Sequence, residues 1–348
     1  MKKTDKIFTE YSFPVDFLWG ASTAGHQVEG GNYDQWTVYE LDNASELATG
    51  AESRLKWLPD WQKFKPLAQN PENYVSGKGV DHYRRYKEDF RIIKKLNLNS
   101  FRFGIEWSRI EPTLGQWNQE AIDHYHTYIR GLKAMGIEPI VNLWHWTHPV
   151  WFEAMGGFSK AANIKHFVRF VEKIATEYGD DIKYILTINE PNVYSSFSFL
   201  TGEWPPNHRS RLRFLKVFYN LAKAHNSAYK TIKANHPHML VGPATQFGNA
   251  QPKRHGKWLD MRVAKLADYV WNWWWVDRIK RHTDFLGFNY YFTDYYQGFH
   301  KVNPPSPHND LGWYMDPAGL ADVLLKASQR YDLPLMVTEN GVADQDDK

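Results

Sequence analysis

The sequence of 348 residues contains no cysteine, and this absence rules out disulfide bonds and thiolate metal sites. No run approaches the roughly 18 apolar residues of a membrane-spanning helix. The opening residues 1–6 are followed by no apolar segment of a signal peptide. Basic blocks that would bind a phosphate backbone are also missing, because 42 Lys and Arg are interspersed with 39 Asp and Glu. These absences predict a cytoplasmic protein with no membrane contact and no nucleic-acid partner.

Aromatic residues are the one class present in excess, at 16% of the chain with 16 Trp and 20 Tyr. Trp and Tyr stack on sugar rings as readily as they fill cores. The run 271–275, Trp-Asn-Trp-Trp-Trp, is expected to pack in the core or in a loop, because large aromatic side chains are usually buried. The aromatic-rich stretch 41–80 is interpreted as loops that either narrow the mouth of a site or form ordinary surface.

Short apolar runs alternate with amphipathic stretches along the chain. Strands are predicted at 17–22, 100–106, 138–144, 184–190, 239–246, 284–291 and 333–340. Helices are predicted at 83–96, 120–135, 167–178, 213–234, 258–281 and 317–331. Such repeats build either a doubly wound parallel sheet or a closed barrel, and the absence of a G-x-G-x-x-G or phosphate loop favours the barrel. We therefore predict a single α/β barrel domain over residues 1–348.

Polar residues collect at the ends of these predicted strands, where a parallel barrel places its active site. They are Gln27, Arg102, Glu106, His145, Asn189, Glu190, Asn289, Tyr291 and Glu339. Glycosidic bond cleavage needs one carboxyl to donate a proton and another to attack the sugar, so Glu190 and Glu339 are the main candidates. Plainer readings stay open: surface positions for the glutamates, an Arg102 that only pairs with Glu106, and a Tyr291 that only fills a layer of the barrel.

A metal site is not predicted. His145 and His148 are close in sequence, but Pro149 disfavours a helix that would align them, and no third ligand is evident. No cofactor is expected either.

Six segments, in order along the chain, together resemble glycoside hydrolase family 1. They are FLWGASTAGHQVEG (17–30), FRFGIEWSRI (101–110), HW (145–146), TINEP (187–191), NYY (289–291) and TENG (338–341). The resemblance implies a (β/α)8 TIM barrel that works as a retaining β-glycosidase. The chain departs from the family pattern at Gly104, where serine is usual, and at Thr147 and His148, where Asp-Leu is usual.

The resemblance also implies roles for the residues at the strand ends. Glu190 corresponds to the acid/base and Glu339 to the nucleophile, with Arg102 and Tyr291 as the neighbours that keep the nucleophile ionised. Residues implied to bind sugar hydroxyls are Gln27, His145, Asn189 and Asn289. The implied reaction is hydrolysis of terminal β-D-glucosyl or β-D-galactosyl residues from small β-glycosides or oligosaccharides, without a cofactor.

Two alternatives to this reaction stay open. A catalytically impaired, sugar-binding barrel fragment is the first. A different barrel hydrolase with a convergent carboxyl pair is the second, and the segments around Gln27 and 289–291 argue against it.

The resemblance stops after the seventh strand, whereas the family continues through a helix, an eighth strand and a final helix. An unclosed barrel exposes the edges of its first and seventh strands. We therefore expect another polypeptide, either a C-terminal fragment or a second chain, to cover them. A cut chain, a naturally split enzyme and a truncated reading frame are the three explanations. Preference among glucosides, galactosides and 6-phospho-glycosides stays open, because the family places part of that recognition in the missing portion.

Overall fold

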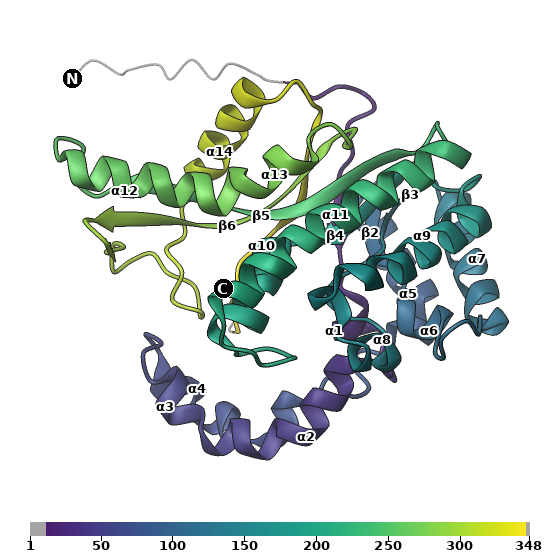
Figure 1. Ribbon diagram of the computed structural model, residues 1–348, viewed down its shortest axis with the longest axis horizontal. Coiled ribbons are helices and arrows are strands. Elements are labelled where there is room, and N and C mark those ends of the chain that lie inside the picture. The colour runs from purple at the N-terminus through teal and green to yellow at the C-terminus, as the bar shows by residue number, and fades with distance from the viewer. Residues whose placement is uncertain (1–11, 346–348) are drawn as a thin grey trace.

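The computed structural model describes residues 12–345, and its centre is a curled sheet of parallel strands (Figure 1). The strands follow one another around the sheet as β1 (Gly20–Ser22), β2 (Ser100–Gly104), β3 (Glu138–Asn142), β4 (Tyr184–Asn189), β5 (Leu240–Pro252), β6 (Leu286–Gln297) and β8 (Leu335–Asn340). The short β7 (His300–Lys301) turns back antiparallel on the end of β6. These are seven strands of a (β/α)8 barrel without the eighth, which confirms the predicted fold.

The barrel is open between its first and last strands. Within residues 12–345, β1 pairs only with β2, and β8 pairs only with β6. Apolar side chains are exposed along this gap: Trp19, just before β1, is 49% exposed, and Val337 on β8 is 44% exposed. An unpaired edge with exposed apolar side chains is a surface that another strand can cover.

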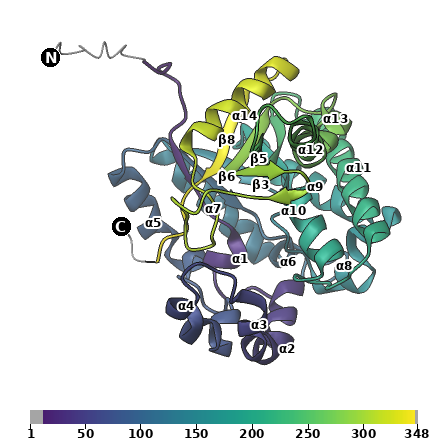
Figure 2. The same cartoon turned by 90° about the vertical axis from the view of Figure 1, so that its left-hand side faces the viewer.

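Amphipathic helices pack on the outside of the sheet, as Figure 2 shows from a second side. They are α5 (His82–Lys95), α7 (Gln119–Ala134), α9 (Ile164–Tyr178), α11 (Arg211–Asn235) and α14 (Pro317–Arg330). Helix α9 illustrates how such a helix packs against the barrel. Its apolar side chains recur on one face and are fully buried: Phe167, Phe170, Val171 and Ile174. The five predicted helices in these regions are confirmed, with ends that differ by up to three residues.

The helix predicted at 258–281 is wrong as a single helix. The chain forms α12 (Trp258–Asp268), a π-helical turn (Tyr269–Trp273) and α13 (Trp274–Ile279). Asn272 explains the break, because its side chain accepts a hydrogen bond from the Gly248 amide and donates one to the Gly248 carbonyl on β5. Of the tryptophans at 271–275, Trp273 and Trp275 are buried as expected. Trp271 instead lines a large central cavity at the C-terminal ends of the strands.

Strands β5 and β6 are longer than the predicted 239–246 and 284–291. Both extend past the barrel as a pair, with registers running on to Pro252 and Tyr296, and α12 lies along this extension in Figure 1. The extension carries many polar side chains, so the sequence resembles a loop there.

The interpretation of residues 41–80 as loops is also wrong. The stretch is mostly helical and begins with α2 (Gln35–Thr49), α3 (Ala51–Leu55) and α4 (Trp61–Ala68), the arc at the bottom of Figure 1. A short 3-10 turn, Pro71–Tyr74, follows. The ring of Trp57 lies against Gly312, in a loop whose Leu311 and Trp313 line the central cavity. This arm therefore touches the mouth of the cavity, one of the two roles expected for the stretch.

None of the helices in the described part of the chain combines the length and the apolar character needed to cross a bilayer.

Core packing by α9 gives a stability prediction. Phe170→Ala should lower the free energy of unfolding by about 3–5 kcal/mol, because it removes a fully buried ring and leaves a cavity. Leu212→Ala, at a side chain 81% exposed in α11, is the matched control and should change it by less than about 0.5 kcal/mol. Urea unfolding followed by circular dichroism measures both. Equal effects of the two substitutions would contradict the described packing of α9.

Candidate active site

A cavity of about 1260 Å³ opens at the C-terminal ends of the barrel strands. Six of the eight residues to which the family resemblance gives a role line it: Gln27, Arg102, His145, Glu190, Tyr291 and Glu339. Asn189 and Asn289 are fully buried and contact these side chains from behind. The cavity also reaches Ser100, Ile140 and Met336, nearer the other end of the strands, because the barrel is open.

Glu339, near the end of β8, has two donors on its carboxylate. One oxygen accepts from the guanidinium of Arg102, and the other accepts from the hydroxyl of Tyr291 at 2.6 Å. Burial raises the pKa of Glu339, but the positive charge of Arg102 and the hydrogen bonds from Arg102 and Tyr291 outweigh it and hold the pKa below its ordinary value. Glu339 is therefore a carboxylate at neutral pH.

Arg102 joins three strands at this end of the barrel. Besides Glu339 on β8, its guanidinium donates to Ser22 Oγ on β1 at 3.1 Å and to Asn189 Oδ1 on β4 at 2.6 Å. The plainer reading in which Arg102 pairs with Glu106 is wrong, because the guanidinium donates to Ser22, Asn189 and Glu339. Glu106 instead accepts a hydrogen bond from Thr147.

Glu190 follows β4 in a strained backbone position. Its φ is 43°, a left-handed value that non-glycine residues seldom adopt, and Pro191 begins the short helix α10 (Pro191–Ser195) directly after it. The Glu190 amide donates to the carbonyl of Ala244 on β5 at 2.7 Å, which fixes this turn. The strand end thereby directs the carboxyl into the cavity.

The carboxyl of Glu190 is surrounded differently from that of Glu339. Its hydrogen-bond donor is the neutral amide of Asn289, at 2.9 Å. Burial and then the negative charge of Glu339 raise the pKa of Glu190 to about 8, although Asn289 and Arg102 oppose this shift. Glu190 therefore keeps its proton at neutral pH.

Asn289, Asn189 and His145 form a hydrogen-bonded chain behind the two glutamates. Asn289 donates to Asn189 Oδ1 at 3.1 Å and accepts from Thr338 Oγ1 at 2.6 Å, while the Asn189 amide lies 3.0 Å from His145 Nε2. Burial lowers the pKa of His145 to about 4, so its ring is neutral. Nε2 of the neutral ring can then accept a hydrogen bond from the Asn189 amide.

Gln27 stands apart from this chain of hydrogen bonds. It lies in the short helix α1 (Gly25–Val28), and its exposed side chain lines the cavity. Aromatic residues line the cavity more widely: Trp146, Phe197, Trp204, Trp271, Phe292 and Trp313.

Sequence reasoning missed several polar contributors. Ser22 and Thr338 bond Arg102 and Asn289, and Trp271 bonds Gln246 in the cavity wall. Ser22 and Thr338 each lie within a segment already singled out, so their placement at strand ends was a usable signal. The Trp271–Gln246 contact joins distant parts of the chain and had no local signal.

Among residues 12–345, no group of three or more histidines and carboxylates is arranged to hold a metal ion. His148 is turned away from the cavity toward Glu153, 2.9 Å from its Nε2. The arrangement instead offers one protonated and one ionised carboxyl in a single cavity, a combination that supports general acid and nucleophilic chemistry on one bond.

Comparisons with known proteins agree with this geometry. The family model described as "Glycosyl hydrolase family 1" matches residues 9–281 and 276–348. Beta-glucosidase A of Thermotoga maritima is 29% identical, over 96% of this chain and 79% of the relative. An aryl-phospho-beta-D-glucosidase of Bacillus subtilis is 26% identical over the same shares. The solved structure of a beta-glycosidase from Pyrococcus horikoshii superposes with a TM-score of 0.81 at 32% identity, over 96% of this chain and 78% of that one.

The opposed environments of the two glutamates give a prediction about pKa. Glu339→Gln removes the negative charge that helps to raise the pKa of Glu190, so that pKa should fall below about 8 yet stay above 4.5, because burial remains the larger cause. Carbon-13 NMR of protein labelled at glutamate carboxyls measures the shift. The matched control is Glu172→Gln on the exposed face of α9, which should leave the titration of Glu190 unchanged. An unchanged Glu190 pKa in Glu339→Gln would show that the two carboxyls do not interact.

Proposed function

This chain belongs to glycosyl hydrolase family 1 and is therefore a glycoside hydrolase, and we propose that Glu190 and Glu339 carry out its reaction. The reaction is removal of terminal β-D-glucosyl residues from small β-glycosides with retention of configuration. The observation that carries the assignment is the pair of carboxyls in one cavity with opposite protonation states. The related beta-glucosidases support the choice of a glucoside substrate.

In the first step, Glu339 attacks the anomeric carbon while Glu190 gives its proton to the glycosidic oxygen, so the bond to the leaving group breaks. In the second step, Glu190, now a carboxylate, takes a proton from water. That water attacks the anomeric carbon and releases Glu339. Arg102 and Tyr291 support this sequence because their donors stabilise Glu339 as the carboxylate that attacks and later leaves.

The sugar sits between the two carboxyls, with Gln27 and His145 at the cavity wall within the region it occupies. Asn189 and Asn289 act from behind, because their amides hold Arg102, Glu190 and His145 in place. A hydrogen bond from Asn189 to a sugar hydroxyl stays a prediction. The alternative of an impaired sugar-binding barrel is weaker, because both carboxyls keep the partners that catalysis needs.

We further propose that one more β-strand, from a C-terminal fragment or a second chain, completes this single catalytic domain. Support comes from the unpaired edges of β1 and β8 and from the exposed Trp19 and Val337 beside them. A location in the cytoplasm stays a prediction from the cysteine-free composition.

The catalytic assignment predicts loss of turnover in both glutamate variants. Glu190→Ala and Glu339→Ala should each lower kcat on 4-nitrophenyl β-D-glucoside at least about 100-fold, because the first removes the acid and base and the second removes the nucleophile. Azide should restore Glu339→Ala and yield the α-glucosyl azide, because the small anion enters the space left on that face of the sugar. Release of nitrophenol and NMR of the product measure both effects.

The control for these variants is Glu172→Ala, whose side chain is exposed on α9 outside the barrel and should keep full turnover. Full turnover in Glu339→Ala would overturn the assignment of the nucleophile. A panel that adds the β-galactoside and the 6-phospho-β-glucoside would rank the substrates.

The completed barrel predicts a second species in active material. Intact-mass spectrometry and denaturing gel electrophoresis of purified, active enzyme should show this chain together with a companion segment, either attached to it or as a separate fragment. Active material that contains only a species with the mass of the 348 residues would contradict the companion.

A further inference from the structure

Glu106 is a buried carboxyl just behind the active site that the proposed reaction does not use. It follows β2 and precedes the short helix α6 (Trp107–Ile110), and it is 4% exposed. Within residues 12–345 it forms no ion pair, and its side chain accepts a hydrogen bond from Thr147, although carboxylates buried this deeply are usually paired with a cation.

The carboxyl of Glu106 lies between the two segments that carry Gln27 and His145, which both line the cavity. One oxygen accepts from the hydroxyl of Thr147 at 2.8 Å, two residues after His145. The other lies against Gly25, where an added Cβ would be only 2.4 Å from it. Gly25 begins α1, which presents Gln27. Glu106 thus touches both the helix that carries Gln27 and the loop that carries His145.

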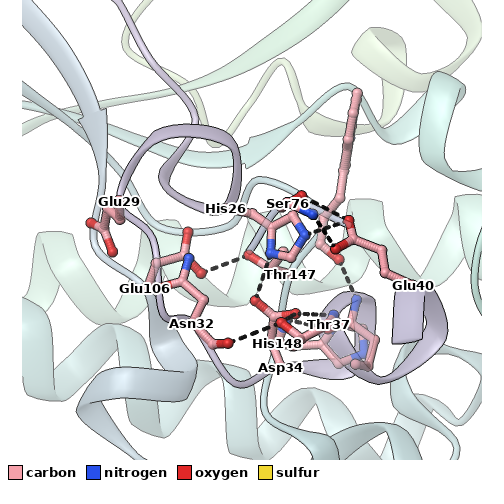
Figure 3. Close-up of polar contacts among 12 residues, drawn as sticks. His26, Glu29, Asn32, Asp34, Thr37, Glu40, Ser76, Glu106, Thr147 and His148 are labelled. Carbon is pink, nitrogen blue, oxygen red and sulfur yellow. Dashed lines mark hydrogen bonds and ion pairs between the residues drawn. The ribbon is translucent and has the colours of Figure 1, made fainter. Parts of the chain in front are cut away.

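The ionisable groups around Glu106 are mostly carboxyls, and Figure 3 shows Asp34 and Glu40 paired with His26. Glu29 accepts from Arg109 and Tyr125, and Asp34 is bound to His26, which also binds Glu40. The groups whose charges act on Glu106 are Glu29, the cap that follows α1, Asp34, the cap that precedes α2, and His26 within α1. From α7, the hydroxyl of Tyr125 accepts a hydrogen bond from the Glu106 amide at 3.2 Å. Beyond Thr147, His148 is turned toward Glu153.

Protonation of Glu106 follows from these surroundings. Burial and then the charges of Glu29 and Asp34 raise the pKa of Glu106 to about 8, with Thr147 and His26 opposing. The pKa of His26 is raised to about 10: burial lowers it, but the bonds to Asp34 and Glu40 outweigh burial. His26 is therefore a cation whose charge is already balanced, and it leaves Glu106 without a counter-ion.

We propose that Glu106 is a positioning residue for sugar binding. Its protonated carboxyl keeps helix α1, which carries Gln27, and the loop that carries His145 in fixed positions relative to each other. Ionisation places an unpaired charge beside Asp34 and beside Glu29, whose own pKa is raised by burial, and directly against Gly25 and Thr147. The two segments then move apart to admit water, and the sugar loses its contacts on that wall. This inference rests on the proposed function, because it takes Gln27 and His145 as sugar-binding residues.

The kinetic test compares Glu106→Gln with the natural enzyme between pH 6 and 9 on 4-nitrophenyl β-D-glucoside. If only the protonated form binds sugar, KM of the natural enzyme should rise about tenfold between pH 6.5 and pH 9, since only about one molecule in ten is then competent. Glutamine cannot ionise, so KM of Glu106→Gln should change by less than about twofold. In both proteins kcat should still fall as Glu190 loses its proton.

Two further variants make the test specific. Glu106→Ala removes the contact to Thr147 at every pH, so its KM should be high throughout, with a smaller effect on kcat. Glu138→Gln is the matched control: Glu138 is a half-buried carboxyl at the opposite end of the neighbouring strand β3, and its pKa is raised by burial. Its KM profile should follow that of the natural enzyme. A KM that rises equally in Glu106→Gln and the natural enzyme would overturn the proposal.

A second measurement does not depend on turnover. In protein carrying Glu190→Gln and nitrogen-15 histidine, the ring signals of His145, assigned through a His145→Asn variant, should shift with a midpoint near pH 8. Adding Glu106→Gln should abolish that shift. A shift that persists, or none at all before the second substitution, would overturn the positioning role. Absence of turnover on every nitrophenyl glycoside, with the shift still present, would instead count against the proposed function alone.

Discussion

The guanidinium of Arg102 is the contact on which the active site depends. It bonds Ser22 on β1, Asn189 on β4 and Glu339 on β8, so a single side chain ties together three strands that the sheet does not pair directly. The tie matters most between β1 and β8, where the backbone ladder is interrupted. Because the same charge also keeps Glu339 ionised, the geometry of the open barrel and the chemistry of its cavity are set by one residue.

The two glutamates differ through their neighbours and not through their depth. Both are largely buried, and burial alone would raise the pKa of each. Arg102 and Tyr291 supply donors to Glu339, whereas Glu190 has only the Asn289 amide, so the proton settles on Glu190. Asn289 sits behind the site and contacts Glu190, and it pairs in register with Glu339 on the adjoining strand. A substitution of Asn289 would therefore affect both carboxyls. Because the charge of Glu339 also raises the pKa of Glu190, the protonation of the two carboxyls is a property of the pair.

Much of this arrangement follows from sequence patterns that are local. Apolar runs closed by Glu190 and Glu339 marked two strands, and parallel strands bring their polar ends to one face of a barrel. What local patterns miss are contacts between distant segments. The break at Asn272 arises because its amide prefers the backbone of Gly248, 24 residues away, to regular helix packing. Glu106 was visible as a polar strand end, but its partner Thr147 depends on how two neighbouring loops fold over the barrel. The helices at 41–80 were missed because apolar side chains such as Leu41 and Leu67 are exposed, so the apolar residues of these helices do not mark one regular buried face.

The absence of a side chain at Gly25 has an evolutionary consequence. The space beside its α-carbon is already filled by the Glu106 carboxyl, so a methyl group and that carboxyl cannot both occupy it. Replacing the glycine first creates a clash with the glutamate, whereas shortening the glutamate first leaves only a void. The two positions are therefore epistatic, and sequence drift through this part of the fold has a permitted direction.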